Sequence, residues 1–428
     1  MLFTIRGNTG DTVFGTYGKR HDFQLNARKA LKYIGPGILI TVGFIDPGNW
    51  AANIAAGAEY GYALLWMVTL ATIMLIFLQH NVAHLGIVTG LCLAEGVTHY
   101  LPRRLARLVL ATAVLAAVAT AMAEILGGGL AISILTGLPV LPACFFTAAA
   151  CFWLLWTNSY KRLEKIIITF VSLIGLSFLA EVTLVHIDWQ AAAPAMVMPS
   201  LPAGSVMIVM SVLGAVVMPH NLFLHSEIVQ SRQWNLQDET VISEQLKYEF
   251  LDTILSMGIG WAINSAMILI AGAVFFSQGI TVTEIGQAQA MLEPMLGKAA
   301  ALLFALALFF AGLASTTTAG MAGGTIYAGI FGEAYQIKDY HSWHGVALTY
   351  LLALVIICLI VDPFQGLVYS QIALSVQLPL TIFTQIYLTS AHKVMGKFAN
   401  TTLQKTILGT IAVIVTLLNG LLLWEMLQ

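Results

Sequence analysis

Two apolar segments of this chain are interrupted by short polar runs that contain a proline, and these interruptions constrain its fold most. The runs are Asp46-Pro47-Gly48-Asn49 and Met218-Pro219-His220-Asn221, and each follows residues apolar enough for the middle of a bilayer. Proline cannot donate a backbone hydrogen bond, and its ring clashes with the preceding helical turn. Broken helices that leave carbonyl groups free beside polar side chains form ion sites near the midplane of transporters. The two runs therefore predict a membrane protein with two broken helices and an ion site beside them.

The composition excludes a water-soluble protein. The chain has 428 residues, of which 58% are hydrophobic and only 9% are charged, whereas a soluble domain carries about 25% charged residues. Its 19 basic and 21 acidic residues nearly balance, and the basic ones are scattered, so no nucleic-acid partner is indicated. The four cysteines show no spacing typical of a metal site and are interpreted as small buried hydrophobes.

Stretches long enough to cross a bilayer, which takes about 20 residues, recur along the whole chain and predict about eleven transmembrane helices. No signal-peptide layout precedes the first of them, so we expect it to remain as a helix. The fold class is therefore an all-α polytopic membrane protein. The predicted spans are 35–57, 62–86, 105–135, 142–157, 164–186, 204–225, 250–277, 299–330, 344–361, 367–390 and 404–427.

The distribution of basic residues predicts the orientation. With the N-terminus in the cytoplasm, every Lys and Arg except Lys298 falls in the N-terminal arm or in a connection on the cytoplasmic side. Such an excess is the usual mark of cytoplasmic loops. An odd number of crossings then places the C-terminus outside the cell, and the short loops favour a prokaryotic inner membrane.

The two interrupted segments are the first and the sixth predicted helices, so equivalent positions are five helices apart. This spacing predicts a LeuT-type architecture of two inverted five-helix repeats with broken helices 1 and 6. The predicted organisation is a cytoplasmic arm at 1–34, a transporter core at 35–390 and a helix 11 region at 391–428.

The side chains at the two breaks predict a cation ligand. A carboxylate inside the membrane costs at least about 2.5 kcal/mol and normally faces a cavity or a partner. No basic residue lies at the depth of Asp46 in either broken helix. Met218 indicates which kind of cation binds, because Mg²⁺ and Ca²⁺ prefer oxygen ligands whereas a thioether favours softer transition-metal ions. Carbonyl oxygens of Gly43 and Ala215, which precede the breaks, can add to the ligand set.

The residues at both breaks resemble those of the Nramp family (natural resistance-associated macrophage proteins), proton-linked importers of manganese and iron. The resemblance rests on the run 46–49 and on the longer run 214–226, which reads GAVVMPHNLFLHS. It extends to the run 56–62 after the first break and to Ser370-Gln371 in the tenth predicted helix.

The resemblance implies which residues bind the metal. By position they are Asp46, Asn49 and Met218, with the carbonyl of Ala215 or Gly43. Gln371 corresponds to a family glutamine that approaches the ion in some states of the transport cycle. Magnesium-selective relatives lack the methionine, so its presence here argues against magnesium.

A proton route is implied less completely. Glu124 corresponds to a family glutamate beside the metal site, and Arg232 to an arginine at the proton exit, while His220 and His225 are candidates for gating or proton transfer. The chain departs from the family at Ala121, where many relatives carry a second acid, and at 391–393, where relatives often carry an arginine pair. Coupled protons and proton-independent uniport therefore both stay open.

The function predicted from the sequence is import of Mn²⁺, Fe²⁺ or a similar ion such as Co²⁺ or Cd²⁺ by alternating access. The expected partners are the metal ion, the lipid bilayer and, if coupled, protons. The rival hypothesis is an amino-acid or amine symporter on the same scaffold. No enzyme activity and no cofactor are predicted, because no nucleophile–base arrangement or phosphate-binding loop occurs.

Overall fold

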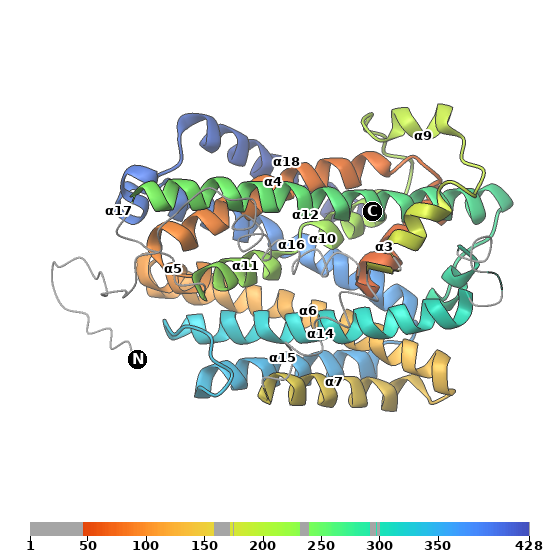
Figure 1. Ribbon diagram of the computed structural model, residues 1–428, viewed down its shortest axis with the longest axis horizontal. Helices are drawn as coiled ribbons and strands as arrows, with labels where there is room; N and C mark the ends of the chain where they lie inside the picture. Colours follow the sequence, from red (N-terminus) through yellow and green to blue (C-terminus); the bar gives the residue numbers. More distant parts are fainter. Residues whose placement is uncertain are drawn as a thin grey trace.

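The computed structural model describes residues 46–157, 172–173, 175–231, 239–291, 297 and 300–427. Within these ranges all regular structure is helical, and the long helices lie side by side along the longest dimension (Figure 1). The α-helices are α3 (Pro47–Tyr60), α4 (Leu65–Thr89), α5 (Leu93–Tyr100), α6 (Arg103–Thr136), α7 (Val140–Trp156), α9 (Trp189–Ala195), α10 (Val206–Val216), α11 (Pro219–Ser231), α12 (Glu239–Val274), α14 (Ala300–Ile330), α15 (Tyr340–Leu359), α16 (Pro363–Ser390), α17 (His392–Met395) and α18 (Thr402–Met426). Short 3₁₀ helices are η1 (Phe276–Gln278), η2 (Ile285–Met291) and η4 (Gly396–Phe398).

The predicted spans correspond closely to these helices. Eight of the eleven match segments long and apolar enough to cross a membrane, namely α4, α6, α10 with α11, α12, α14, α15, α16 and α18. The fourth span is the 17-residue helix α7. The first and fifth spans, 35–57 and 164–186, lie partly outside the described residues, as does the whole predicted arm at 1–34.

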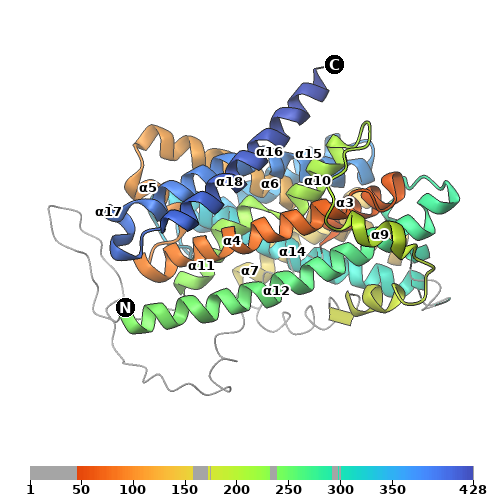
Figure 2. The ribbon, with the colours of Figure 1, turned by 90° about the horizontal axis from the view of Figure 1, so that it is seen from above.

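Three features of the bundle differ from the sequence expectation. Helix α12 begins at Glu239 rather than at 250, because its polar first turns are held by Ile242, which packs with Val229 of α11. The short helices α5, α9 and α17 are too small or too polar to be recognised as spans, and they lie near the ends of the bundle (Figure 2). Cys358 is exposed, although the other three cysteines are buried as expected.

Both breaks occur at the predicted prolines. Pro47 is the first residue of α3, and the Asp46 side chain caps this helix by accepting a hydrogen bond of 2.6 Å from the Asn49 N–H. Helix α10 ends at Val216, and Pro219 begins α11. Proline suits a first helical position, where its missing N–H leaves no intrahelical bond unmade.

Glycines on α6 allow its neighbours to approach closely. A Cβ atom at Gly127 would lie 2.1 Å from the Cβ of Pro47, and one at Gly129 would lie 2.3 Å from the Sγ of Cys144 on α7. From α14, a Cβ at Gly312 would lie 2.7 Å from the Cα of Gly128. The interpretation of the triple glycine as a close-packing face is therefore confirmed.

We predict that Gly312→Ala destabilises the protein, because the added methyl group meets the backbone of α6, which cannot rotate away. Overpacking of this kind costs about 1–3 kcal/mol. The matched control is Gly258→Ala in α12, where no atom lies within 4 Å of the added Cβ and alanine favours the helix by about 1 kcal/mol. Thermal unfolding of both variants in detergent tests this. An equal or higher unfolding temperature for Gly312→Ala would contradict the packing described here.

Candidate metal site at the two helix breaks

Helix α6 contacts the second break through residues one turn apart. Ala116 packs against the buried Met218, and Thr120 Oγ1 lies 3.0 Å from Nδ1 of His220. Residues four apart share one face of a helix. The same face of α6 therefore reaches both the methionine and the histidine of the second break.

The next turns of this face reach the first break. Glu124 lies close enough to Asp46 for the two carboxyl groups to interact electrostatically, and it is also near Ser315 of α14. One turn further, Gly127 packs against Pro47. Because Glu124 follows Thr120 by one turn, which is about 6 Å along the axis, α6 brings the two breaks to neighbouring levels of the bundle.

Helix α16 supplies the third wall of the site. A Cβ at Gly48 would lie 2.0 Å from the Nε2 of Gln371 and 3.4 Å from an Asp46 oxygen, so the Gln371 carboxamide lies directly against the first break. The backbone carbonyl of Gln371 packs on α10, where a Cβ at Gly214 would lie 1.8 Å from it. Gln371 Nε2 donates to Ser370 Oγ at 2.9 Å, while its buried Oε1 has no protein hydrogen-bond partner in the described part of the chain. The structure thus places Gln371 between the two broken helices.

The second break leaves a carbonyl oxygen available. In an α-helix the carbonyl of Ala215 would accept from the N–H four residues later, but that residue is Pro219, which has none. Gly43 precedes Pro47 by the same interval, but Gly43 lies outside the described residues. Of the two carbonyls predicted from the sequence, only that of Ala215 can therefore be placed.

The candidate ligands are enclosed by protein. Asp46, Asn49, Ala215, Met218 and Gln371 are each no more than 2% exposed. Asn221 Nδ2 donates to Met218 Sδ at 3.1 Å, so the thioether already has a polar neighbour. Among the ion pairs of the described residues, none includes Asp46. A carboxylate buried in this way is stabilised by a cation, since an isolated buried charge is costly.

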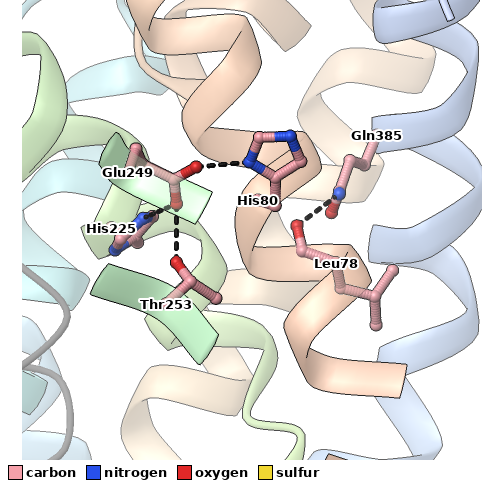
Figure 3. A network of polar contacts seen from close by, with 6 residues as sticks. All are labelled: Leu78, His80, His225, Glu249, Thr253 and Gln385. Atoms are coloured by element: carbon pink, nitrogen blue, oxygen red, sulfur yellow. Dashed lines mark hydrogen bonds and ion pairs between the residues drawn. The ribbon is translucent and has the colours of Figure 1, made fainter. Parts of the chain in front are cut away.

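His225 belongs to a separate polar network deeper along α11. Its Nε2 lies 3.4 Å from Oε1 of Glu249 on α12, which also accepts a hydrogen bond of 2.6 Å from Thr253 (Figure 3). The other oxygen of Glu249 bonds to Nδ1 of His80 on α4. One buried carboxylate therefore ties α4, α11 and α12 together.

Sequence reasoning missed His80 and Glu249. Glu249 lies one residue before the predicted span 250–277, so the sequence does not indicate it as a membrane residue. His80 stands between Gln79 and Asn81 in α4, and only the fold brings it to Glu249. Beside this network, Gln385 of α16 donates to the Leu78 carbonyl of α4 at 2.8 Å. Arg232, predicted at the proton exit, lies outside the described residues.

A further polar contact joins the first broken helix to its neighbour. Asn53 of α3 donates to Asn264 of α12 at 2.6 Å, and both side chains are buried. Hydrogen bonds of this kind between side chains hold helices together in a membrane. Movement of α3 therefore requires α12 to move with it or this contact to break.

Comparison with known proteins supplies relatives for nearly the whole chain. A transporter from Caldanaerobacter subterraneus, named divalent metal cation transporter MntH, is 36% identical over 405 residues, which is 94% of this chain and 94% of the relative. The protein of the same name from Deinococcus radiodurans is 36% identical over 431 residues, covering 99% of this chain and 95% of its own.

Solved structures agree with this relationship. A crystal structure of the manganese transporter of Eremococcus coleocola has a TM-score of 0.75 and 27% sequence identity, and covers 92% of this chain and 86% of its own. Mhp1, a nucleobase-cation-symport-1 family transporter in a closed conformation, has a TM-score of 0.57 at 15% identity, over 90% of this chain and 91% of its own, and shows the fold alone. The predicted LeuT-type fold is thereby confirmed.

The family model described as natural resistance-associated macrophage protein-like, Nramp, matches residues 37–425. This range includes both broken helices, the glutamate of α6 and the glutamine of α16, and it confirms the resemblance seen in the sequence. The chain belongs to the Nramp family.

Proposed function

We propose that this protein is a secondary transporter that imports divalent transition-metal ions, Mn²⁺ and Fe²⁺ foremost, across the inner membrane. The observation that carries the proposal is the buried pair of helix breaks, with the Asp46 carboxylate at one and the Met218 thioether at the other. The names of the curated relatives, divalent metal cation transporters, support the same substrate class. Co²⁺ and Cd²⁺ suit the same ligands.

In this proposal the ion exchanges most of its water shell for protein ligands. Asp46, Asn49 and Met218 bind it together with the Ala215 carbonyl, and Gln371 approaches from α16. To bind through sulfur, the ion displaces the Asn221 amide from Met218. A carboxylate and carboxamides alone would also suit Mg²⁺ and Ca²⁺, so the thioether supplies the preference for softer ions. Gly43 completes the predicted ligand set.

Alternating access is explained by the position of the ligands at the ends of two half-helices. Asp46 caps the half-helix α3, and Met218 directly precedes the half-helix α11, so tilting either half-helix opens the site while the ligands keep their order. The network of His80, His225 and Glu249 holds α11 against α4 and α12 (Figure 3). We infer that this network stabilises one end state of the cycle.

Proton coupling uses groups beside the metal site. Asp46 cannot keep a proton and bind the ion at the same time, so metal and proton compete there. Glu124 receives the displaced proton, and His220, His225 and Arg232 continue the route toward the cytoplasm. Ala121 removes one acid from this route, which keeps a proton-independent uniporter as the second candidate. The N-terminus is assigned to the cytoplasm and the C-terminus to the outside.

We predict that Met218→Ala lowers Mn²⁺ uptake and removes the discrimination against Ca²⁺ and Mg²⁺. Loss of even a supporting partner of a metal ligand costs about 10–100-fold, so uptake at low Mn²⁺ should fall by at least about tenfold. The assay is uptake into liposomes with Ca²⁺ or Mg²⁺ as competitor. Met210→Ala, a change at a fully buried methionine of α10, is the control and should retain the discrimination. If Met218→Ala still discriminates against Ca²⁺ and Mg²⁺, Met218 is not a ligand that determines selectivity.

We predict that Glu124→Gln uncouples proton movement from metal movement. The substitution keeps the shape of the side chain but removes its exchangeable proton, so lumenal acidification per Mn²⁺ should fall while Mn²⁺ binding persists. General acid–base groups contribute about 10²–10⁴-fold, and we expect at least the lower figure in proton flux. A pH dye and a metal dye in the same liposomes measure both. Glu333→Gln, at a carboxylate paired with His341 near the bundle end, is the control. Unchanged acidification would assign the proton to another group.

We predict that Glu249→Gln slows transport without weakening metal binding. The carboxylate joins α4, α11 and α12 but touches neither break, so its loss changes the balance of conformations. Coupling between distant sites is typically about 5–150-fold, and uptake should fall by at least the lower figure. Thr253→Val removes only one hydrogen bond of the network and should have a smaller effect. Uptake equal to the wild type would show that the network does not control the cycle.

A further inference from the structure

A second group of metal-ligating side chains lies away from the helix breaks, where α5 meets α11. Ligand atoms of Cys92, Glu95 and Glu227 all lie within 4.8 Å of one another. Cys92 is fully buried, and both glutamates are 7% exposed. The cluster cannot be recognised from the sequence, because Glu227 is far from the other two residues along the chain.

Part of the cluster has an ordinary structural explanation. Glu95 is the third residue of α5 and accepts a 2.9 Å hydrogen bond from the Cys92 N–H, as in a capping box. The same oxygen accepts from Gln230 at 2.7 Å. The N–H of Leu93 donates to Ser226 of α11 at 2.8 Å. These contacts fix the geometry of α5 against α11 and account for the position of Glu95.

Glu227 has no such explanation. It approaches the Cys92 thiol and the backbone of Tyr335, yet its buried Oε2 has no hydrogen-bond partner in the described part of the chain. Neither Glu95 nor Glu227 takes part in an ion pair among the described residues. Burying a carboxylate oxygen without a partner is costly. The burial of Glu227 without a partner for this oxygen therefore favours a positively charged partner at this place.

The buried hydroxyl group of Tyr335, whose backbone Glu227 approaches, has no hydrogen-bond partner among the described residues either. Two carboxylates lie side by side in the cluster without a basic partner among the described residues. A cation at the centre of the cluster would offset their mutual repulsion.

We propose that Cys92, Glu95 and Glu227 form a second binding site, for a thiophilic divalent cation of the Zn²⁺ and Cd²⁺ class. One sulfur and two carboxylate oxygens suit such ions, whereas Mg²⁺ and Ca²⁺ favour oxygen alone. Three protein ligands leave a fourth position for water. Glu227 follows Met218 by nine residues, which is about 14 Å along a helix, so this site is separate from the one at the breaks. The proposal does not depend on transport.

The test uses the full-length protein in detergent with the first site removed. In Asp46→Asn/Met218→Ala, we expect a single Cd²⁺ ion to remain bound per chain after desalting, with the ultraviolet charge-transfer band of a cadmium thiolate. A thioether gives no thiolate band, so the band reports on cysteine alone. Absence of both bound Cd²⁺ and the band in this background would overturn the proposal.

Single changes in the same background identify the ligands. Cys92→Ser should abolish the band, and Glu227→Gln, which retains the thiol, should weaken Cd²⁺ affinity by at least about tenfold. Cys151→Ser, at a buried cysteine on α7 that faces the Leu313 carbonyl, is the control and should keep the band. If Cys92→Ser fails to fold by circular dichroism and gel filtration, Glu227→Gln decides, and unchanged affinity there rejects the site. Failure of Mn²⁺ uptake by the wild type would instead reject the transport proposal and leave this result standing.

Discussion

The unsatisfied backbone at two prolines is the constraint on which the rest of the structure depends. Pro219 withholds the N–H that the Ala215 carbonyl would receive in a continuous helix, and Pro47 begins α3 in the same way. In a bilayer each unsatisfied backbone group costs several kcal/mol, so irregular backbone survives only where protein or a cavity surrounds it. Both breaks must therefore lie inside the bundle, covered by other helices.

Helices α6 and α16 cover the breaks through close contacts at glycines. Gly127 of α6 leaves room for Pro47 of α3. Gly48 of α3 and Gly214 of α10 leave room for Gln371 of α16. The breaks also satisfy part of their own polarity, since Asn49 donates to Asp46 and Asn221 donates to Met218. A thioether is only a weak acceptor, so in the proposed site a metal ion replaces the Asn221 amide at Met218 at little cost. The packing that protects the breaks thus leaves ligands that can be released.

The sequence was sufficient for features with a local cause. Apolar length predicted the spans, the prolines predicted the breaks, and the glycine run of α6 predicted close packing. Contacts between distant segments had no local cause. Gln371 is placed by two glycines more than a hundred residues away, and Glu249 gains its role only because the fold brings His80 and His225 to it. The predicted span also starts later than α12 for the same reason, because Ile242 packs against Val229 of α11.

The buried acidic residues differ in role because their side chains have different interaction partners. Glu249 contacts two histidines and a threonine, so both of its oxygens have partners within the protein and it joins three helices. Asp46 and Glu124 lie close enough to interact electrostatically, and neither has an ion-pair partner among the described residues. Like charges in one buried site cannot both ionise unless a cation joins them. A buried carboxylate therefore has two roles in this protein. Glu249 joins α4, α11 and α12, whereas Asp46 and Glu124, beside the helix breaks, favour a cation.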